Sequence, residues 1–181
     1  MYKWTVTLLV GLALAMTAAV GAQQGAAGKK GTLTAADYVE IEQLYARYNH
    51  YIDSVKDDGW AYARLFTADG VFDTGPIVGV HTGHEELAAL SRSSGRAGVL
   101  SPGHIAYNVM IEPSAEGAVG AAYYGFVVQP SELGKPTNGR GFGMYKDRFV
   151  KTADGWRFKY RLFVLAGTDV DGDNSPLPSS E

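Results

Sequence analysis

The sequence predicts an α+β fold in which three N-terminal helices pack in a strongly bent, mostly antiparallel sheet that encloses a pocket. Apolar residues in the first half of the chain recur at helical spacing, whereas those after Pro102 alternate with a period of two. Helices and strands are thus separated along the chain, which is typical of α+β proteins. No internal repeat is visible in the sequence.

The first helix is predicted over residues 34–54. Thr34 and Asp37 have the spacing of a capping box, in which each side chain accepts a hydrogen bond from the other's backbone N–H. The apolar residues that follow recur every three or four positions and so share one helical face: Tyr38, Ile41, Leu44, Tyr45, Tyr48 and Ile52. This face is expected to pack against the sheet.

Two shorter helices and a short strand are predicted next. One helix covers residues 58–67, and a strand over residues 71–73 follows the turn at Asp69-Gly70. Thr82 and Glu85 have capping-box spacing, which predicts the start of the third helix.

Four strands are predicted after Pro102, over residues 104–112, 118–129, 140–151 and 156–166. β-Branched and aromatic residues fill these segments, and Gly, Pro, Asn or Asp separate them. Asp154-Gly155 supplies the positive φ that a hairpin turn between the last two strands requires. The four strands are therefore expected to form an antiparallel meander.

The ends of the chain differ from this central region. Residues 1–22 combine one basic residue with an apolar stretch and small residues before Gln23, which predicts a cleaved signal peptide and an exported protein, periplasmic or secreted. An uncleaved membrane anchor is the alternative. Residues 23–33 predict a flexible leader and residues 168–181 a disordered tail, since both are poor in apolar side chains that could pack. The folded domain is expected over residues 34–167, with no membrane contact after cleavage.

Composition excludes several classes of function. Lys and Arg number 16 against 19 Asp and Glu, giving a formal net charge of -3, and no run of five basic residues occurs. No nucleic-acid partner is therefore expected. The absence of cysteine excludes disulfides and thiolate nucleophiles. His81, His84 and Glu85 lack the spacing of known zinc motifs, so no metal and no other cofactor is expected.

Asp53 and His104 are the candidate catalytic pair. Asp53 borders the apolar face near the end of the first predicted helix, and His104 begins the first long strand. If the sheet curls over this helix, both reach one cavity, where the carboxylate would fix the imidazole tautomer and raise its basicity. On spacing alone, the plainer interpretation is favoured: Asp53 ends the helix or contacts solvent, and His104 is an ordinary core histidine.

Four motifs, together with Asp53, favour the catalytic interpretation of the Asp53–His104 pair. They are Ile41–Tyr48, Leu65–Phe72, His104–Asn108 and Asp154–Phe158. In these motifs the chain resembles the SnoaL-like branch of the nuclear-transport-factor-2-like (NTF2-like) superfamily over about residues 34–166. Within that branch it is similar to scytalone dehydratase, hexachlorocyclohexane dehydrochlorinase and bile-acid dehydratase. The resemblance implies a cone of bent sheet and three helices with a deep pocket, and a catalytic Asp–His pair at Asp53 and His104.

The sequence also departs from scytalone dehydratase. The tyrosine that precedes the aspartate in that enzyme is Ile52 here, its second pocket histidine falls at Tyr123, and its pocket asparagine falls at Tyr145. A dehydration between two histidines and paired tyrosines is therefore not implied. Tyr123 and Tyr145 are instead predicted to bind substrate through their hydroxyls, with plain core tyrosines as the alternative. The other predicted pocket residues are Phe72, Asn49 and Asn108.

The predicted function is a cofactor-independent lyase. His104 would act as general base and acid and Asp53 would orient it, in a proton abstraction followed by elimination. Loss of water is the first candidate reaction, and a retro-aldol C–C cleavage or a double-bond isomerisation would use the same pair. The substrate is expected to be small, apolar and hydroxylated, with aromatic and polycyclic compounds among the candidates. The alternative is a non-catalytic small-molecule-binding or assembly module.

An oligomer is predicted from the first long strand. Its alternation puts Ile105, Tyr107, Val109 and Ile111 on the face opposite the pocket. A second subunit is the natural cover for such an apolar face, so a homo-oligomer, dimer or trimer, is expected.

Overall fold

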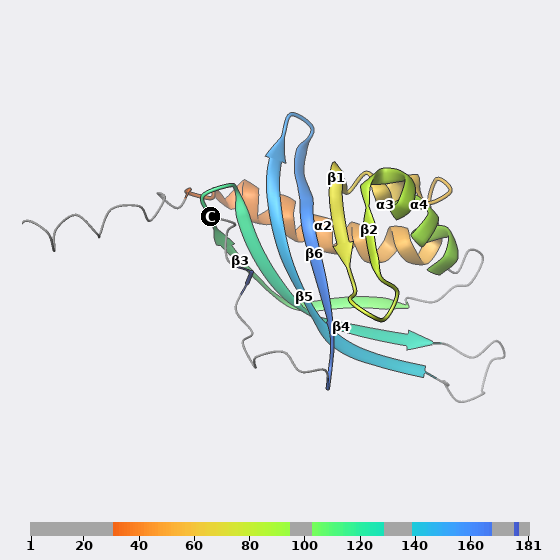
Figure 1. The fold of residues 1–181 in the computed structure, drawn as a ribbon. Coiled ribbons are helices and arrows are strands. Elements are labelled where there is room, and N and C mark those ends of the chain that lie inside the picture. The colour runs from red at the N-terminus through yellow and green to blue at the C-terminus, as the bar shows by residue number, and fades with distance from the viewer. Residues whose placement is uncertain (1–30, 95–102, 129–138, 168–175, 178–181) are drawn as a thin grey trace, which may run out of the picture. The chain divides into compact units, whose positions relative to one another are not determined.

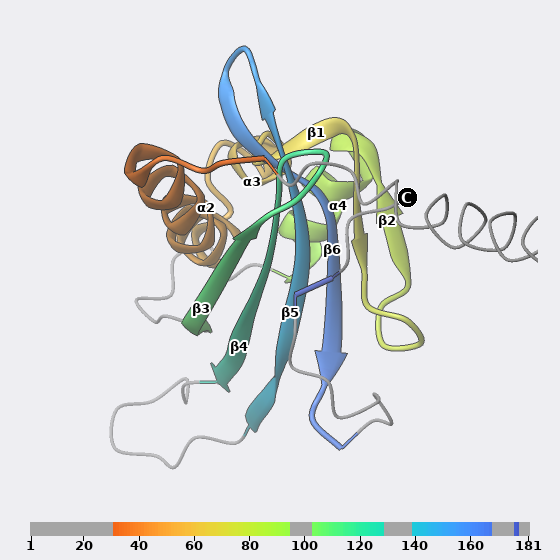
Figure 2. The ribbon, with the colours of Figure 1, turned by 90° about the vertical axis from the view of Figure 1, so that its left-hand side faces the viewer.

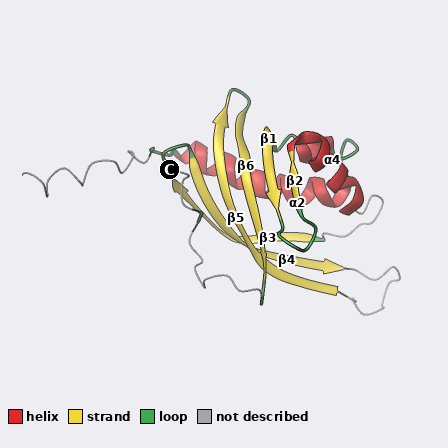
Figure 3. Ribbon diagram, viewed as in Figure 1, coloured by secondary structure: helices red, strands yellow, loops and turns green. Residues whose placement is uncertain are grey.

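Three helices lie on the concave side of a bent six-stranded sheet (Figures 1 and 3). The structure is a computed structural model that describes residues 31–94, 103–128, 139–167 and 176–177. Within them the helices are α2 (Ala35–Ser54), α3 (Trp60–Ala63) and α4 (Gly83–Ser94). The strands are β1 (Phe66–Asp73), β2 (Val80–Thr82), β3 (His104–Pro113), β4 (Ala118–Val128), β5 (Gly139–Thr152) and β6 (Gly155–Leu165).

The sheet has the order β2-β1-β6-β5-β4-β3. Neighbouring strands run antiparallel except β1 and β6, which are parallel. Seen from the side, β3 to β6 curve past α2 (Figure 2). The predicted α+β fold with a strongly bent, mostly antiparallel sheet is confirmed.

Helix α2 begins as the sequence predicts. The Thr34 hydroxyl accepts the Asp37 N–H at 3.3 Å, and the Asp37 carboxylate accepts the Thr34 N–H at 2.8 Å, which completes the capping box. The helix ends at Ser54, and its C-cap residue, Val55, has a left-handed backbone (φ 50°). Of the apolar residues predicted on the inner face of this helix, Tyr38 is exposed. The others are buried as predicted: Ile41, Leu44, Tyr45, Tyr48 and Ile52.

The second predicted helix is wrong in extent. It was expected over residues 58–67, but α3 covers only Trp60–Ala63, and the chain enters β1 at Phe66. The cause is pairing with the last strand: the Phe158 N–H donates to the Leu65 carbonyl at 3.0 Å, and Phe66 pairs with Phe158. A tertiary contact therefore overrides the local helical pattern.

Strand β2 was not predicted, and it changes the start of the third helix. Its residues pair antiparallel with Val71–Asp73. The Thr82 N–H donates to the carboxylate of Glu86 at 2.7 Å, so Glu86 takes the place that the predicted capping box gave to Glu85. The helix that follows, α4, packs against β1.

A β-bulge at Asn108 divides β3. Before the bulge His104 pairs with Phe126, and after it Met110 pairs with Ala121, so the register shifts by one residue. Asn108 has a left-handed backbone (φ 51°), which Asn adopts more readily than most residues. The predicted alternation is therefore wrong beyond Tyr107: Val109 and Ile111 face inward and pack against the core, while Asn108 and Met110 are exposed.

The core between α2 and the sheet contains a buried ion pair. Arg161 on β6 donates from Nε and Nη2 to the two carboxylate oxygens of Asp147 on β5, at 2.7 and 2.9 Å, and both side chains are fully buried. The guanidinium carbon lies 4.0 to 5.0 Å from the centroids of four rings: Tyr45, Tyr48, Tyr145 and Phe158. Burial alone would lower the pKa of Arg161, but the Asp147 charge raises it above its usual value, so the cation persists.

The predicted signal peptide over residues 1–22 lies outside the described residues, as do residues 23–30 of the leader and all of the tail except residues 176–177. Gly31 and Leu33, also in the predicted leader, are part of the fold. The Gly31 N–H donates to the Ser114 carbonyl at 3.2 Å, and Leu33 packs against the core. The start of the packed region is therefore corrected from residue 34 to residue 31. Among the described helices, none is long and apolar enough to cross a membrane.

Candidate active site

A cavity of about 150 Å³ opens between α2, α4 and the concave face of the sheet. Rings form much of its wall: Tyr48, Phe72, Tyr124, Tyr145 and Phe163. His104 also lines it. The cavity is therefore an apolar chamber with one imidazole and a few hydroxyls, which is the usual make-up of a small-molecule site.

Asp53 and His104 meet at this cavity. Oδ1 of Asp53 lies 2.6 Å from Nδ1 of His104, and Oδ2 accepts the backbone N–H groups of Gly103 and His104 at 2.8 and 3.0 Å. Only 13% of the Asp53 side chain and 12% of the His104 side chain are exposed. The last turn of α2 and the first residue of β3 thus converge on one carboxylate.

The chain has a glycine where this convergence is tightest. A Cβ on Gly103 would lie 2.9 Å from Oδ1 of Asp53 and 3.1 Å from the Phe126 ring, both closer than packed side chains normally tolerate. Gly103 therefore lets the backbone N–H approach the carboxylate. The sequence pattern before His104 did not reveal this role.

The hydrogen bonds keep Asp53 ionised. Partial burial raises the pKa of Asp53, but the hydrogen bonds from the His104 ring and from the backbone of His104 and Gly103 outweigh it, and the pKa is lowered overall. An ionised carboxylate accepts the Nδ1 proton. In the neutral form of the ring, this leaves the lone pair on Nε2, the nitrogen that can exchange a proton with a bound molecule.

Rings surround the imidazole on the sheet side. The Phe126 centroid lies 4.8 Å from the His104 centroid, and the Tyr124 centroid lies 5.9 Å from it. Tyr145 and Tyr48 stand deeper, with their ring centroids 5.5 Å apart, and the Tyr62 hydroxyl donates to that of Tyr48 at 3.3 Å. Burial raises the pKa of Tyr48, Tyr124 and Tyr145, so all three phenols are neutral at neutral pH.

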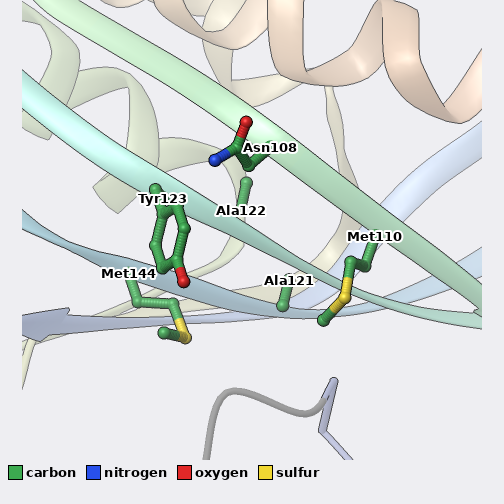
Figure 4. Close-up of a pocket in the computed structure, with 6 residues that line it drawn as sticks. All are labelled: Asn108, Met110, Ala121, Ala122, Tyr123 and Met144. Atoms are coloured by element: carbon green, nitrogen blue, oxygen red, sulfur yellow. The ribbon is translucent and has the colours of Figure 1, made fainter.

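The predicted site residues divide between the two faces of the sheet. Phe72 and Tyr145 line the cavity with His104. Tyr123 and Asn108 do not: they lie on the outer face, in a hollow of about 400 Å³ that Met110 and Met144 also line (Figure 4). Their assignment to the His104 pocket is corrected accordingly.

The bulge explains this error. An unbroken ladder counted back from the pair of Pro113 and Ala118 would match Asn108 with Tyr123, on the same face as His104. The extra residue shifts the register, so Tyr107 pairs with Tyr123 and both side chains turn outward.

Tyr124 is one of the cavity residues that the sequence analysis did not predict. It pairs with Ala106, two residues after His104, and so shares the face of His104. The tandem Tyr123-Tyr124 always puts one tyrosine on each face, and only the position of the bulge decides which faces inward.

Asn49, the remaining predicted pocket residue, is half-buried and is not among the residues that line the cavity. Its side-chain oxygen is buried and has no hydrogen-bond partner among the described residues. Over the same residues, no three His, Asp or Glu side chains converge in a way that could hold a metal ion.

Solved structures share this fold. A scytalone dehydratase-like protein from Novosphingobium aromaticivorans is 22% identical, with a TM-score of 0.59, covering 81% of this chain and 95% of that one. A protein of unknown function with a cystatin-like fold from Nostoc punctiforme is 24% identical, with a TM-score of 0.58, covering 76% and 97%. An NTF2-like protein with a cystatin-like fold from N. aromaticivorans is 19% identical, with a TM-score of 0.58, covering 91% and 94%.

Sequence comparison identifies the family to which the chain belongs. A search of curated protein sequences found no match. The family model described as a SnoaL-like domain matches residues 33–162, which include α2, Asp53, His104 and most of the sheet. The chain therefore belongs to the SnoaL-like domain family.

Proposed function

We propose that this protein is a cofactor-independent lyase in which Asp53 and His104 catalyse proton abstraction and elimination. The observation that carries the proposal is the 2.6 Å contact between Oδ1 of Asp53 and Nδ1 of His104 at the wall of an apolar cavity. Such a carboxylate fixes the tautomer of the imidazole and leaves the lone pair on its other nitrogen, which can then accept a proton. The SnoaL-like family includes polyketide cyclases and dehydratases, which agrees with this chemistry.

The first candidate reaction is loss of water from a hydroxylated substrate. Nε2 of His104 takes a proton from carbon, the electrons of that C–H bond form a carbon–carbon double bond, and the C–O bond breaks toward the hydroxyl. The imidazolium then gives its proton to the leaving hydroxyl, which departs as water, so the protein ends unchanged. Asp53 stabilises the imidazolium between the two steps. A retro-aldol cleavage or an isomerisation would use the same proton transfers.

Two neutral phenols are placed to bind the substrate. Tyr145 and Tyr124 line the cavity on the same side as His104. The Tyr124 hydroxyl can donate to a carbonyl or enolate oxygen, which would favour loss of a proton from the adjacent carbon, and the Tyr145 ring is part of the apolar wall. The apolar rings around them suit a small hydroxylated substrate with an aromatic or other apolar body.

The test is a turnover screen of β-hydroxy ketones that bear one ring, followed by the ultraviolet absorbance of the conjugated product. We expect His104→Ala and Asp53→Asn each to lower the rate about 10²- to 10⁴-fold while circular dichroism shows folding retained. His50→Ala and Asp58→Asn are matched controls, because His50 and Asp58 are exposed. Equal turnover in the His104 variant and the controls would contradict the proposal. Binding without turnover in the wild type would favour a non-catalytic module.

We further propose that the protein works after export, because residues 1–22 have the pattern of a signal peptide. The mass of the protein recovered from the periplasm or the medium tests this. Loss of residues 1–22 is expected, and recovery of the uncut chain in the membrane fraction would contradict it.

A further inference from the structure

The loop that joins β1 and β2 (Figure 1) is held by hydrogen bonds within the loop itself. The Thr74 hydroxyl donates to the Gly79 carbonyl at 2.9 Å and accepts the Val78 N–H at 3.0 Å. The Thr74 N–H donates to the same Gly79 carbonyl at 3.0 Å, and the Gly79 N–H donates to the Gly75 carbonyl at 3.1 Å. Thr74 itself is 3% exposed, so the loop is anchored from within.

This anchored loop holds two aliphatic side chains in solvent at the cavity wall. Ile77 is 47% exposed and Val78 is 55% exposed, yet both line the cavity that contains His104. A loop with this many internal hydrogen bonds does not need Ile or Val at these positions, because its bonds come from Thr74 and the backbone. Their position suggests that a bound molecule covers them.

Val80 provides an internal comparison. It is 56% exposed, like Val78, but it pairs with Asp73 in the β1–β2 ladder, next to the pair of Phe72 and His81. Because neighbouring residues of a strand point to opposite faces, and Phe72 faces the cavity, Val80 faces away from it.

The size of the chamber limits what can enter it. Sites for drug-sized ligands have volumes of about 300 to 1,000 Å³. The chamber here, about 150 Å³, matches the size of an engineered cavity that holds a single benzene ring. A substrate larger than one ring must therefore extend beyond the chamber, and Ile77 and Val78 stand at its edge.

We propose that Ile77 and Val78 form an apolar rim that binds the non-reacting part of the substrate. The substrate would then consist of a reacting group of about one ring, placed at His104, and an apolar extension that lies on the rim. This inference deepens the proposed function and rests on it for the identity of the reacting end, but binding to the rim does not itself require catalysis.

The test measures the dissociation constants of 4-ethylphenol and 4-hexylphenol by isothermal titration calorimetry. A fully buried methylene improves affinity about fourfold, and one covered on a single side about twofold. Four added methylenes should therefore tighten binding to the wild type about 16-fold. The double variant Ile77→Ser/Val78→Ser should reduce this ratio to about threefold or less, while the matched control Val80→Ser should keep it.

His104→Ala separates this proposal from the proposed chemistry. We expect it to lower turnover about 10²- to 10⁴-fold, as above, and to keep the 16-fold ratio of dissociation constants, since the rim is unchanged. His104→Ala could leave turnover intact while the Ile77→Ser/Val78→Ser variant shows the reduced ratio of dissociation constants. In that case the proposed chemistry is wrong and the proposed rim is supported. The proposed rim would be contradicted by an equal ratio of dissociation constants in the wild type and the double variant. It would also be contradicted if the affinity of the wild type did not depend on the length of the alkyl group.

Discussion

Asp53 holds His104 by both its ring and its backbone. One carboxylate oxygen contacts Nδ1 and the other accepts the N–H of the same residue. The orientation of the imidazole and the start of β3 therefore depend on one side chain at the end of α2. An arrangement fixed in this way needs little reorganisation before a proton is transferred.

Gly103→Ala should disturb this arrangement. The added methyl group would lie 2.9 Å from Oδ1 of Asp53, so the carboxylate or the strand must move. A shift approaching 1 Å at a catalytic group costs up to about 100-fold, and we expect turnover to fall about 10- to 100-fold. Gly125→Ala is the matched control, since its Cβ would meet ordinary contacts at 3.8 and 3.9 Å. Similar rates for the two variants would argue against the role of Gly103.

Asp53 should make stability depend on pH in the acid range. Its pKa in the folded protein is below the ordinary value of 3.8, so the carboxylate contributes stability at pH values above 3.8 that is lost as the pH falls through the folded pKa. The difference in unfolding free energy between the wild type and Asp53→Asn should therefore shrink as the pH falls from about 5 toward 2. Urea unfolding at several pH values measures this, and a difference that stays constant would contradict it.

The two adjacent tyrosines of β4 should behave differently. Tyr124→Phe removes a hydroxyl at the cavity, and loss of one neutral hydrogen bond to substrate should weaken catalysis about 3- to 10-fold. Tyr123→Phe changes the outer face and should leave the rate unchanged. Steady-state rates of both variants check this, and the reverse order of effects would mean that β4 faces the other way.

Arg161→Met should strongly destabilise the fold. It leaves the Asp147 carboxylate fully buried without its partner, which typically costs about 3 to 5 kcal/mol. The double variant Asp147→Leu/Arg161→Met removes both charges and should recover most of that loss. Urea unfolding compares the three proteins. A double variant no more stable than the single one would show that Arg161 stabilises the fold through its contacts with the four surrounding rings rather than by pairing with the charge of Asp147.

The predicted homo-oligomer stays a prediction, with a corrected surface. The outer face of β3, β4 and β5 exposes large apolar side chains: Ile105, Tyr107, Met110, Tyr123 and Phe142. We expect a second subunit to cover this face, so Phe142→Glu should shift the protein to a monomer in light scattering at micromolar concentration. Val39→Glu, at an exposed apolar position of α2, is the control. A wild-type monomer would contradict the prediction.

Local patterns predicted the elements that local chemistry determines. The start of α2 follows from Thr34 and Asp37, and the last hairpin follows from Asp154-Gly155, so both were located within a residue or two. Phe66 was misassigned because its partner, Phe158, lies far along the chain. Tyr123 was misassigned because the bulge is defined by pairing between strands, and no single strand carries that signal.

The position of β6 has a consequence for biosynthesis. β6, the last strand in the described part of the chain, is an interior strand of the sheet, with β1 on one side and β5 on the other. A ribosome must therefore make nearly the whole domain before the two halves of the sheet can join, and such long-range pairing folds slowly. A chain that stops before Gly155 would leave two long unpaired edges, which favour aggregation. A truncation that removes β6 should therefore prevent correct folding of the whole sheet, although Asp53 and His104 lie far from β6 in the sequence.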